Sequence, residues 1–109
     1  LGHRLYAPSF QFPGTLRQGD SGGSVQILQY MLALLAEYSE VLLPVTADGV
    51  FGPSTAEAVR IFQRQYGLTP DGIAGPVTWE AIHSRYQRLY VALQSNQAYQ
   101  ENSQEGATS

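Results

Sequence analysis

The sequence contains no cysteine and no lysine, and it has no long apolar run. Without cysteine the chain can form neither a disulfide nor a thiolate site. All six basic residues are arginines and the formal net charge is −3, which argues against the basic face that non-specific nucleic-acid binding needs. No apolar stretch approaches the roughly 18 residues that cross a bilayer. We therefore expect neither a nucleic-acid partner nor a membrane span.

The length and composition indicate one folded domain. The chain has 109 residues, of which 43% are hydrophobic and 14% are charged. Domains usually have about 100–200 residues, and an apolar content this high with so few charges favours a core over disorder. Because the first residue is Leu1 rather than Met, we expect the chain to be a fragment or a processed form.

Apolar residues at helical spacing predict three helices and an all-α fold. The first covers residues 25–38 and is apolar around most of its circumference, so it must be covered on several sides. The second begins at Pro53 and the third at Pro76, since proline suits the first helical position. Gly67 is placed to end the second helix, and the third is expected to run to about Leu93.

The predicted domain therefore covers residues 15–93 as a compact three-helix bundle. Residues 1–14 contain prolines and aromatics without a helical period, so we expect an extended arm. Residues 94–109 are rich in Gln, Asn, Ser, Gly and Glu, and such a composition predicts a disordered tail. Ser21 or Ser24 is expected to cap the first helix.

The most informative feature of the sequence for fold and function is an internal repeat. Residues 46–59 align with residues 69–82 at an offset of 23, and eight of the fourteen positions are identical. Each copy indicates a tight turn followed by a helix start, in which Asp bonds nearby backbone N–H groups and the next Gly adopts a positive φ. We expect Val50 and Ile73 to enter the core. The turn residues of the two copies are Asp48, Gly49 and Gly52, and Asp71, Gly72 and Gly75.

These residues resemble the peptidoglycan-binding domain with a repeated Asp-Gly-x-x-Gly-Pro-x-Thr motif, which occurs on bacterial cell-wall hydrolases and spore-associated wall proteins. The resemblance covers about residues 16–86. It implies a three-helix bundle, peptidoglycan as the ligand, and attachment to other domains of a larger parent protein. It also implies a location at the cell wall or elsewhere outside the cytoplasm, spores included. The residues that carry it are 16–22, 25, 28–29, 48–53, 55, 58–59, 62–63, 66–68, 71–76 and 78–79.

The residue inventory predicts a non-catalytic module without a metal or cofactor. Its two histidines, His3 and His83, are expected on the surface and have no nucleophile or base suitably placed beside them. Asp48 and Asp71 occupy equivalent places in the repeated turn, and the further oxygen ligands of a calcium loop do not follow them. We therefore expect both carboxylates to be structural.

Five residues are the candidates for ligand contact. The muramyl stem peptide carries carboxylates and amides, and arginine binds carboxylates through two parallel hydrogen bonds. The spacing of the second helix places the charged residues and Gln63 on a face away from the core, next to the Phe51 loop. The alternative is a solvated helix face without a ligand. The five candidates are Phe51, Arg60, Gln63, Arg64 and Tyr66.

A protein–protein interaction module is the second functional hypothesis. The apolar first helix could present a surface to a partner. The extended third helix could do the same through its residues Tyr86, Leu89, Tyr90 and Leu93. Binding to purified sacculi would separate a wall-binding module from an interaction module.

Overall fold

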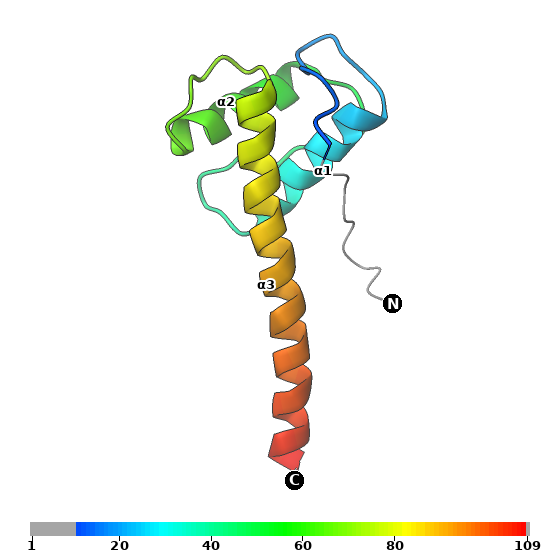
Figure 1. Ribbon diagram of the computed structural model, residues 1–109, viewed down its shortest axis with the longest axis vertical. Helices are drawn as coiled ribbons and strands as arrows, with labels where there is room; N and C mark the ends of the chain where they lie inside the picture. Colours follow the sequence, from blue (N-terminus) through cyan, green and yellow to red (C-terminus); the bar gives the residue numbers. More distant parts are fainter. Residues whose placement is uncertain (1–10, 109) are drawn as a thin grey trace.

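The protein is all-α, as the sequence predicts. The computed structural model describes the backbone of residues 11–108 and the side chains of residues 11–95. Three helices follow one another in the order α1 (Gly23–Glu37), α2 (Pro53–Gln65) and α3 (Pro76–Thr108). Figure 1 shows α1 and α2 gathered around the first part of α3, which then extends well beyond both. In residues 11–108 the β-type pairing is limited to two isolated bridges.

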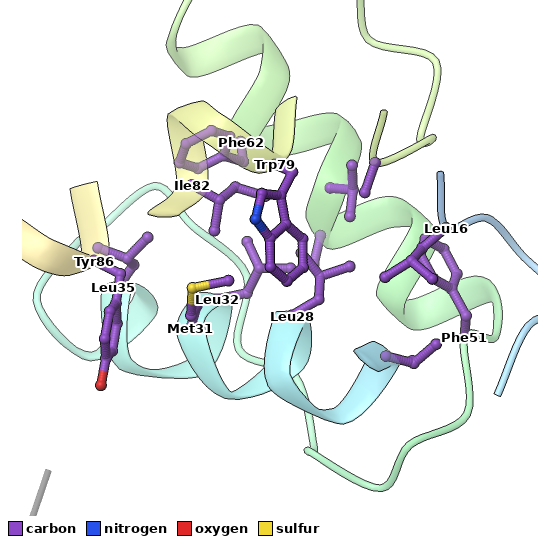
Figure 2. Packing of buried hydrophobic residues seen from close by; sticks show 14 of the residues in the cluster. Leu16, Leu28, Met31, Leu32, Leu35, Phe51, Phe62, Trp79, Ile82 and Tyr86 are labelled. Carbon is purple, nitrogen blue, oxygen red and sulfur yellow. The ribbon is translucent and has the colours of Figure 1, made fainter. Parts of the chain in front are cut away.

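The core lies where the first half of α3 crosses α1 and α2, and α3 packs mainly against α1. Figure 2 shows Trp79 of α3 facing Leu28 of α1, and Ile82 of α3 on the side of Met31 and Leu32. Phe62 of α2 and Tyr86 of α3 are fully buried in the same cluster. The apolar spacing predicted these buried positions correctly, because one side of each helix must leave water.

The starts of α2 and α3 confirm the role of the two prolines, but the start of α1 differs from the prediction. Pro53 and Pro76 are the first residues of their helices. At α1 the N-cap is Gly22, with φ 125°, and no side chain caps the helix. Ser21 precedes this cap and Ser24 follows it. Neither hydroxyl therefore occupies the N-cap position, from which a side chain reaches the free N–H groups.

The α3 helix continues past the end at residue 93 that the sequence predicts. Its last helical residue is Thr108, so residues 94–108 are helical where we expected a disordered tail. Gln, Ala and Glu are good helix formers, and the stretch contains no proline to break the helix. The expected arm over residues 1–14 falls largely outside the described residues.

The two loops of the repeat place different residues in the core from those predicted. Phe51 and Ala74 are buried, whereas the preceding Val50 is 57% exposed and Ile73 is only partly buried. Val50 and Ile73 contribute to the turn through their backbone instead: the N–H of each donates to the side chain of the Asp two residues earlier. That turn directs the next residue inwards, so the core residue comes one position later in each copy.

A short segment before α1 fastens both loops to the bundle. Leu16 exchanges two backbone hydrogen bonds with Ala74, of 3.1 and 2.8 Å. The Phe51 N–H donates to the Asp20 carbonyl at 2.9 Å, and the Gly22 N–H donates to the Gly49 carbonyl at 2.8 Å. The two loops are therefore held from the same side by one stretch of chain.

Candidate functional site

A buried glutamine of α1 holds the first loop in place. Gln29 is 1% exposed, and its Oε1 accepts the Gly49 N–H at 2.7 Å. Its Nε2 donates to Asp48 Oδ1 at 3.1 Å, to the Val50 carbonyl at 2.9 Å and to Thr55 Oγ1 at 2.9 Å. One amide therefore links α1, the loop and the first turn of α2.

A second glutamine, on α2, makes the same set of bonds to the second loop. Gln63 is also 1% exposed, and its Oε1 accepts the Gly72 N–H at 2.9 Å. Its Nε2 donates to Asp71 Oδ1, to the Ile73 carbonyl and to Thr78 Oγ1 at 2.9, 3.1 and 3.0 Å. The sequence repeat is thus matched by a repeated hydrogen-bond cluster, which we call the glutamine clamp.

The carboxylates of Asp48 and Asp71 are fixed by these clamps and remain ionised. The Val50 N–H, followed by the Gln29 amide, holds the pKa of Asp48 below its ordinary value. The Ile73 N–H and then the Gln63 amide lower the pKa of Asp71 in the same way, with a small contribution from Arg17. In both loops the next residue is a glycine with positive φ, 79° at Gly49 and 75° at Gly72. In both copies the Asp-Gly pair thus forms a tight turn closed by a bond from the backbone to the aspartate side chain.

Two open clefts lie beside the clamped loops and correspond to each other through the repeat. Their volumes are about 280 Å³ at the first loop and about 380 Å³ at the second. Every residue that lines the first cleft has its counterpart 23 positions later in the second. The first cleft is lined by residues 44–46, 48, 50 and 52–55, and the second by residues 67–69, 71, 73 and 75–78 together with Gln63.

Two of the five predicted contact residues are interior residues. Gln63 donates and accepts within its clamp, so the expectation that it projects from α2 beside the arginines is wrong. Phe51 is 1% exposed, because the turn directs it into the core rather than towards solvent. The sequence could not distinguish these positions, since glutamine is normally exposed and Phe51 lies outside any helical period.

The two arginines among the remaining candidates lie on the outer side of α2, but both are already paired with Glu57. Arg60 Nε donates to Glu57 Oε1 at 2.9 Å, and Arg64 Nη2 lies 3.8 Å from Glu57 Oε2. Arg60 also covers the second loop, since a Cβ added to Gly72 would lie 2.7 Å from Arg60 Nη1. Arg60 therefore adjoins the Gly72 loop, and not the Phe51 loop as expected. Whether the two arginines contact a ligand stays a prediction.

Tyr66 follows α2 and is partly buried between an arginine and a phenylalanine. The Arg85 guanidinium carbon lies 4.3 Å from the Tyr66 ring centroid, a cation–π geometry. The Phe62 ring lies 4.6 Å from it on a tilted plane. One face of the phenol is thus occupied by a cation from α3, which favours a packing role for this ring.

The sequence interpretation missed the glutamine clamps, although the signal was present. The pairs Leu28-Gln29 and Phe62-Gln63 each precede an Asp-Gly loop, and in each pair both side chains are buried. His83 is also buried, 8% exposed, so its expected surface position is wrong. Desolvation lowers the pKa of this imidazole, partly offset by the negative charge of Glu80.

The described residues contain neither a metal-binding group of side chains nor a membrane-spanning helix. No three His, Cys, Asp or Glu side chains among them come together as a group able to hold a metal ion. None of the described helices has the length and apolar content needed to cross a bilayer.

The segment of sequence that contains both clamps and both clefts matches one known protein family. Residues 21–82 match the family described as "Putative peptidoglycan binding domain". The zinc D-Ala-D-Ala carboxypeptidase of Streptomyces albus G is 43% identical over 59 residues, which are 54% of this chain and 22% of that protein. The chain therefore spans only about a fifth of this curated relative.

Solved structures with the same arrangement of helices include three of similar sequence. A peptidoglycan-binding protein from Clostridioides difficile, crystallised with glutamine hydroxamate, is 42% identical with a TM-score of 0.58, over 66% of this chain and 42% of that one. The SleB N-terminal domain is 35% identical with a TM-score of 0.56, over 66% of this chain and 92% of that domain. A Burkholderia AP3 phage endolysin is 40% identical with a TM-score of 0.53, over 63% of this chain and 24% of that chain.

Proposed function

The chain belongs to the peptidoglycan-binding domain family, and from this premise we propose that it is a non-catalytic module that holds a larger parent protein at the bacterial cell wall. The observation that carries the proposal is the family match over residues 21–82, which covers all three helix starts and both clamped loops. Attachment to a polymer raises the local concentration of any catalytic domain joined to the module. The expected location is the cell wall or elsewhere outside the cytoplasm, and spores are one such setting.

The two loop carboxylates do not have the raised pKa that a general acid in hydrolysis needs. A carboxylic acid that donates a proton near neutral pH needs a raised pKa. Asp48 and Asp71 have lowered pKa values instead, because backbone N–H groups and clamp amides stabilise the charged form. Both groups are thus suited to accepting hydrogen bonds and unsuited to general acid catalysis.

The function is tested by sedimentation of the purified chain with bacterial sacculi. We expect the protein to co-sediment in a saturable manner and to release no soluble muropeptides during prolonged incubation. Protein that stays in the supernatant at all sacculus concentrations would contradict wall binding. That result would favour the alternative interaction module, in which α1 and the extended α3 present a surface to a partner protein.

The exposed side of α2 is our candidate for contact with carboxylates of the stem peptide. Arg60 and Arg64 share one carboxylate, that of Glu57, so the three side chains together carry one net positive charge. We expect the double variant Arg60→Ala and Arg64→Ala to bind sacculi more weakly at low salt, with a smaller difference at high salt where exposed charges are screened. Unchanged affinity at low salt would remove this surface from consideration. Arg88→Ala, an exposed arginine on α3, is the matched control.

A further inference from the structure

The two clefts share the same chemistry as well as the same positions in the repeat. Each contains one carboxylate, Asp48 in the first and Asp71 in the second, and no arginine or histidine lines either cleft. Arg17 and Arg60 lie near the second loop, but within each cleft the charged lining group is a carboxylate, which a ligand carboxylate would meet at short range. The clefts are suited to groups that donate hydrogen bonds, and unsuited to the anionic groups that the α2 arginines would attract.

The clamps leave the outer oxygen of each carboxylate available. Oδ1 of Asp48 accepts bonds from the Val50 N–H and from Gln29, and Oδ1 of Asp71 accepts the matching pair from Ile73 and Gln63. Within the described part of the chain no hydrogen bond reaches Oδ2 of either residue. Each carboxylate is therefore held rigidly by one oxygen, and the other remains free to accept a donor.

An apolar branched side chain and a hydroxyl accompany each carboxylate. Val50 lines the first cleft and is 57% exposed, and Ile73 takes its place in the second. Thr46 and Thr69 are exposed at corresponding positions. These three groups match a secondary amide that bears a methyl group. The carboxylate can accept its N–H, the threonine hydroxyl can donate to its carbonyl, and the apolar side chain can contact its methyl group.

We propose that the two clefts are equivalent subsites, each of which takes one secondary amide that bears a methyl group, with its N–H donated to Oδ2 of Asp48 or Asp71. This inference rests on the proposed function, because a polymer with repeated units is the ligand that two equal subsites fit. Peptidoglycan offers this chemistry in the acetamido groups of its sugars and in the alanine amides of its peptides. Two weak subsites on one domain would together give a higher avidity for the polymer than either alone.

Asp→Asn substitutions separate contact from folding at these positions. In Asp48→Asn and Asp71→Asn the side-chain oxygen can still accept the two clamp bonds, but the outer atom becomes a donor and loses its charge. We expect each single variant to reduce sacculus affinity by about tenfold, the loss expected for one hydrogen bond to a charged acceptor, and the double variant to reduce it further. Glu40→Gln, which removes an exposed carboxylate outside both clefts, should bind as the unsubstituted chain does.

The ligand chemistry is tested on the unsubstituted chain by nuclear magnetic resonance titration. The two probes are an N-acetylglucosamine tetramer and N-acetyl-alanine methylamide. We expect one or both to shift the backbone amide signals of Gly49 and Gly72 together. A response to the sugar alone or to the peptide alone identifies the source of the amide. No response of either loop to either probe, or a response of one loop only, would overturn the proposal.

The outcomes for the clefts and for the overall function remain distinguishable. If the unsubstituted chain fails to sediment with sacculi, the wall-binding function is wrong. If it sediments and the double Asp→Asn variant, folded by circular dichroism, sediments equally well, the wall-binding function stands and the two subsites are overturned.

Discussion

Gln29 and Gln63 occupy equivalent positions on successive helices and make the same four hydrogen bonds. Each accepts the N–H of the glycine in an Asp-Gly loop and donates to the aspartate, to a loop carbonyl and to a threonine of the next helix. The sequential order matters: α1 holds the loop that leads into α2, and α2 holds the loop that leads into α3. Each helix thereby positions the start of its successor.

Loss of either clamp should destabilise the whole domain. Gln29→Leu or Gln63→Leu keeps the buried volume but leaves a loop N–H, a carbonyl and a threonine hydroxyl without their amide partner. Buried polar groups left unpaired cost about 1–3 kcal/mol each, and partial access to water reduces the sum, so we expect about 2–4 kcal/mol. Urea denaturation measures the change. Gln65→Leu, an exposed glutamine on α2, should stay within about 0.5 kcal/mol, and an equal loss in that control would contradict a specific clamp.

The two clamped aspartates should make the domain less stable in acid. A carboxyl group whose pKa is lowered by folding binds protons more readily in the unfolded chain, so its stabilising effect is present above the ordinary value of 3.8 and is lost as the pH falls through the lower folded value. Melting temperatures recorded from pH 7 to pH 2 should fall below about pH 4. The fall should be smaller in the double variant Asp48→Asn and Asp71→Asn, and identical profiles would show that these groups do not contribute.

Truncation of Phe51 should destabilise the domain much more than truncation of Val50. The sequence repeat predicts the reverse, because it assigns Val50 to the core. Phe51→Ala removes a fully buried ring and should cost about 3–5 kcal/mol. Val50→Ala truncates a side chain that is mostly exposed and should cost no more than about 0.5 kcal/mol. Chemical denaturation of the two variants gives the comparison. A larger effect at Val50 would mean that the loop turns the other side chain into the core.

Removal of residues 94–109 should leave the fold and wall binding unchanged. Among the described side chains of α3, which reach residue 95, the last fully buried one is Tyr86, and the helix beyond it extends away from α1 and α2 (Figure 1). We expect the same melting temperature, the same sedimentation with sacculi and a lower total helical signal. A melting temperature lower by several degrees would show that the end of α3 contributes to the packed unit.

Most of the fold was predictable because it follows from local rules. Proline at a first helical position located the starts of α2 and α3, and the apolar spacing identified Phe62 and Ile82 as core residues. What could not be derived depends on contacts between distant segments. Gln63 is polar and lies on a helix, so composition alone assigns it to the surface, and only the loop that meets it explains its burial. The sequence predicted that Arg60 and Arg64 lie outside the core. It did not reveal that both pair with Glu57, which reduces the positive charge that they present to a ligand.

A core residue of α3, Tyr86, stands at the place where α2 carries its clamp glutamine. Gln63 lies eight residues after Thr55, and the residue eight positions after Thr78 is Tyr86, which is fully buried. A phenol hydroxyl has one donor hydrogen where an amide has two, so α3 has no group at this place that could hold a further Asp-Gly loop in the same manner. The clamp is therefore not repeated on α3, and a designed third copy would need Tyr86→Gln before a loop of this kind could be held after α3.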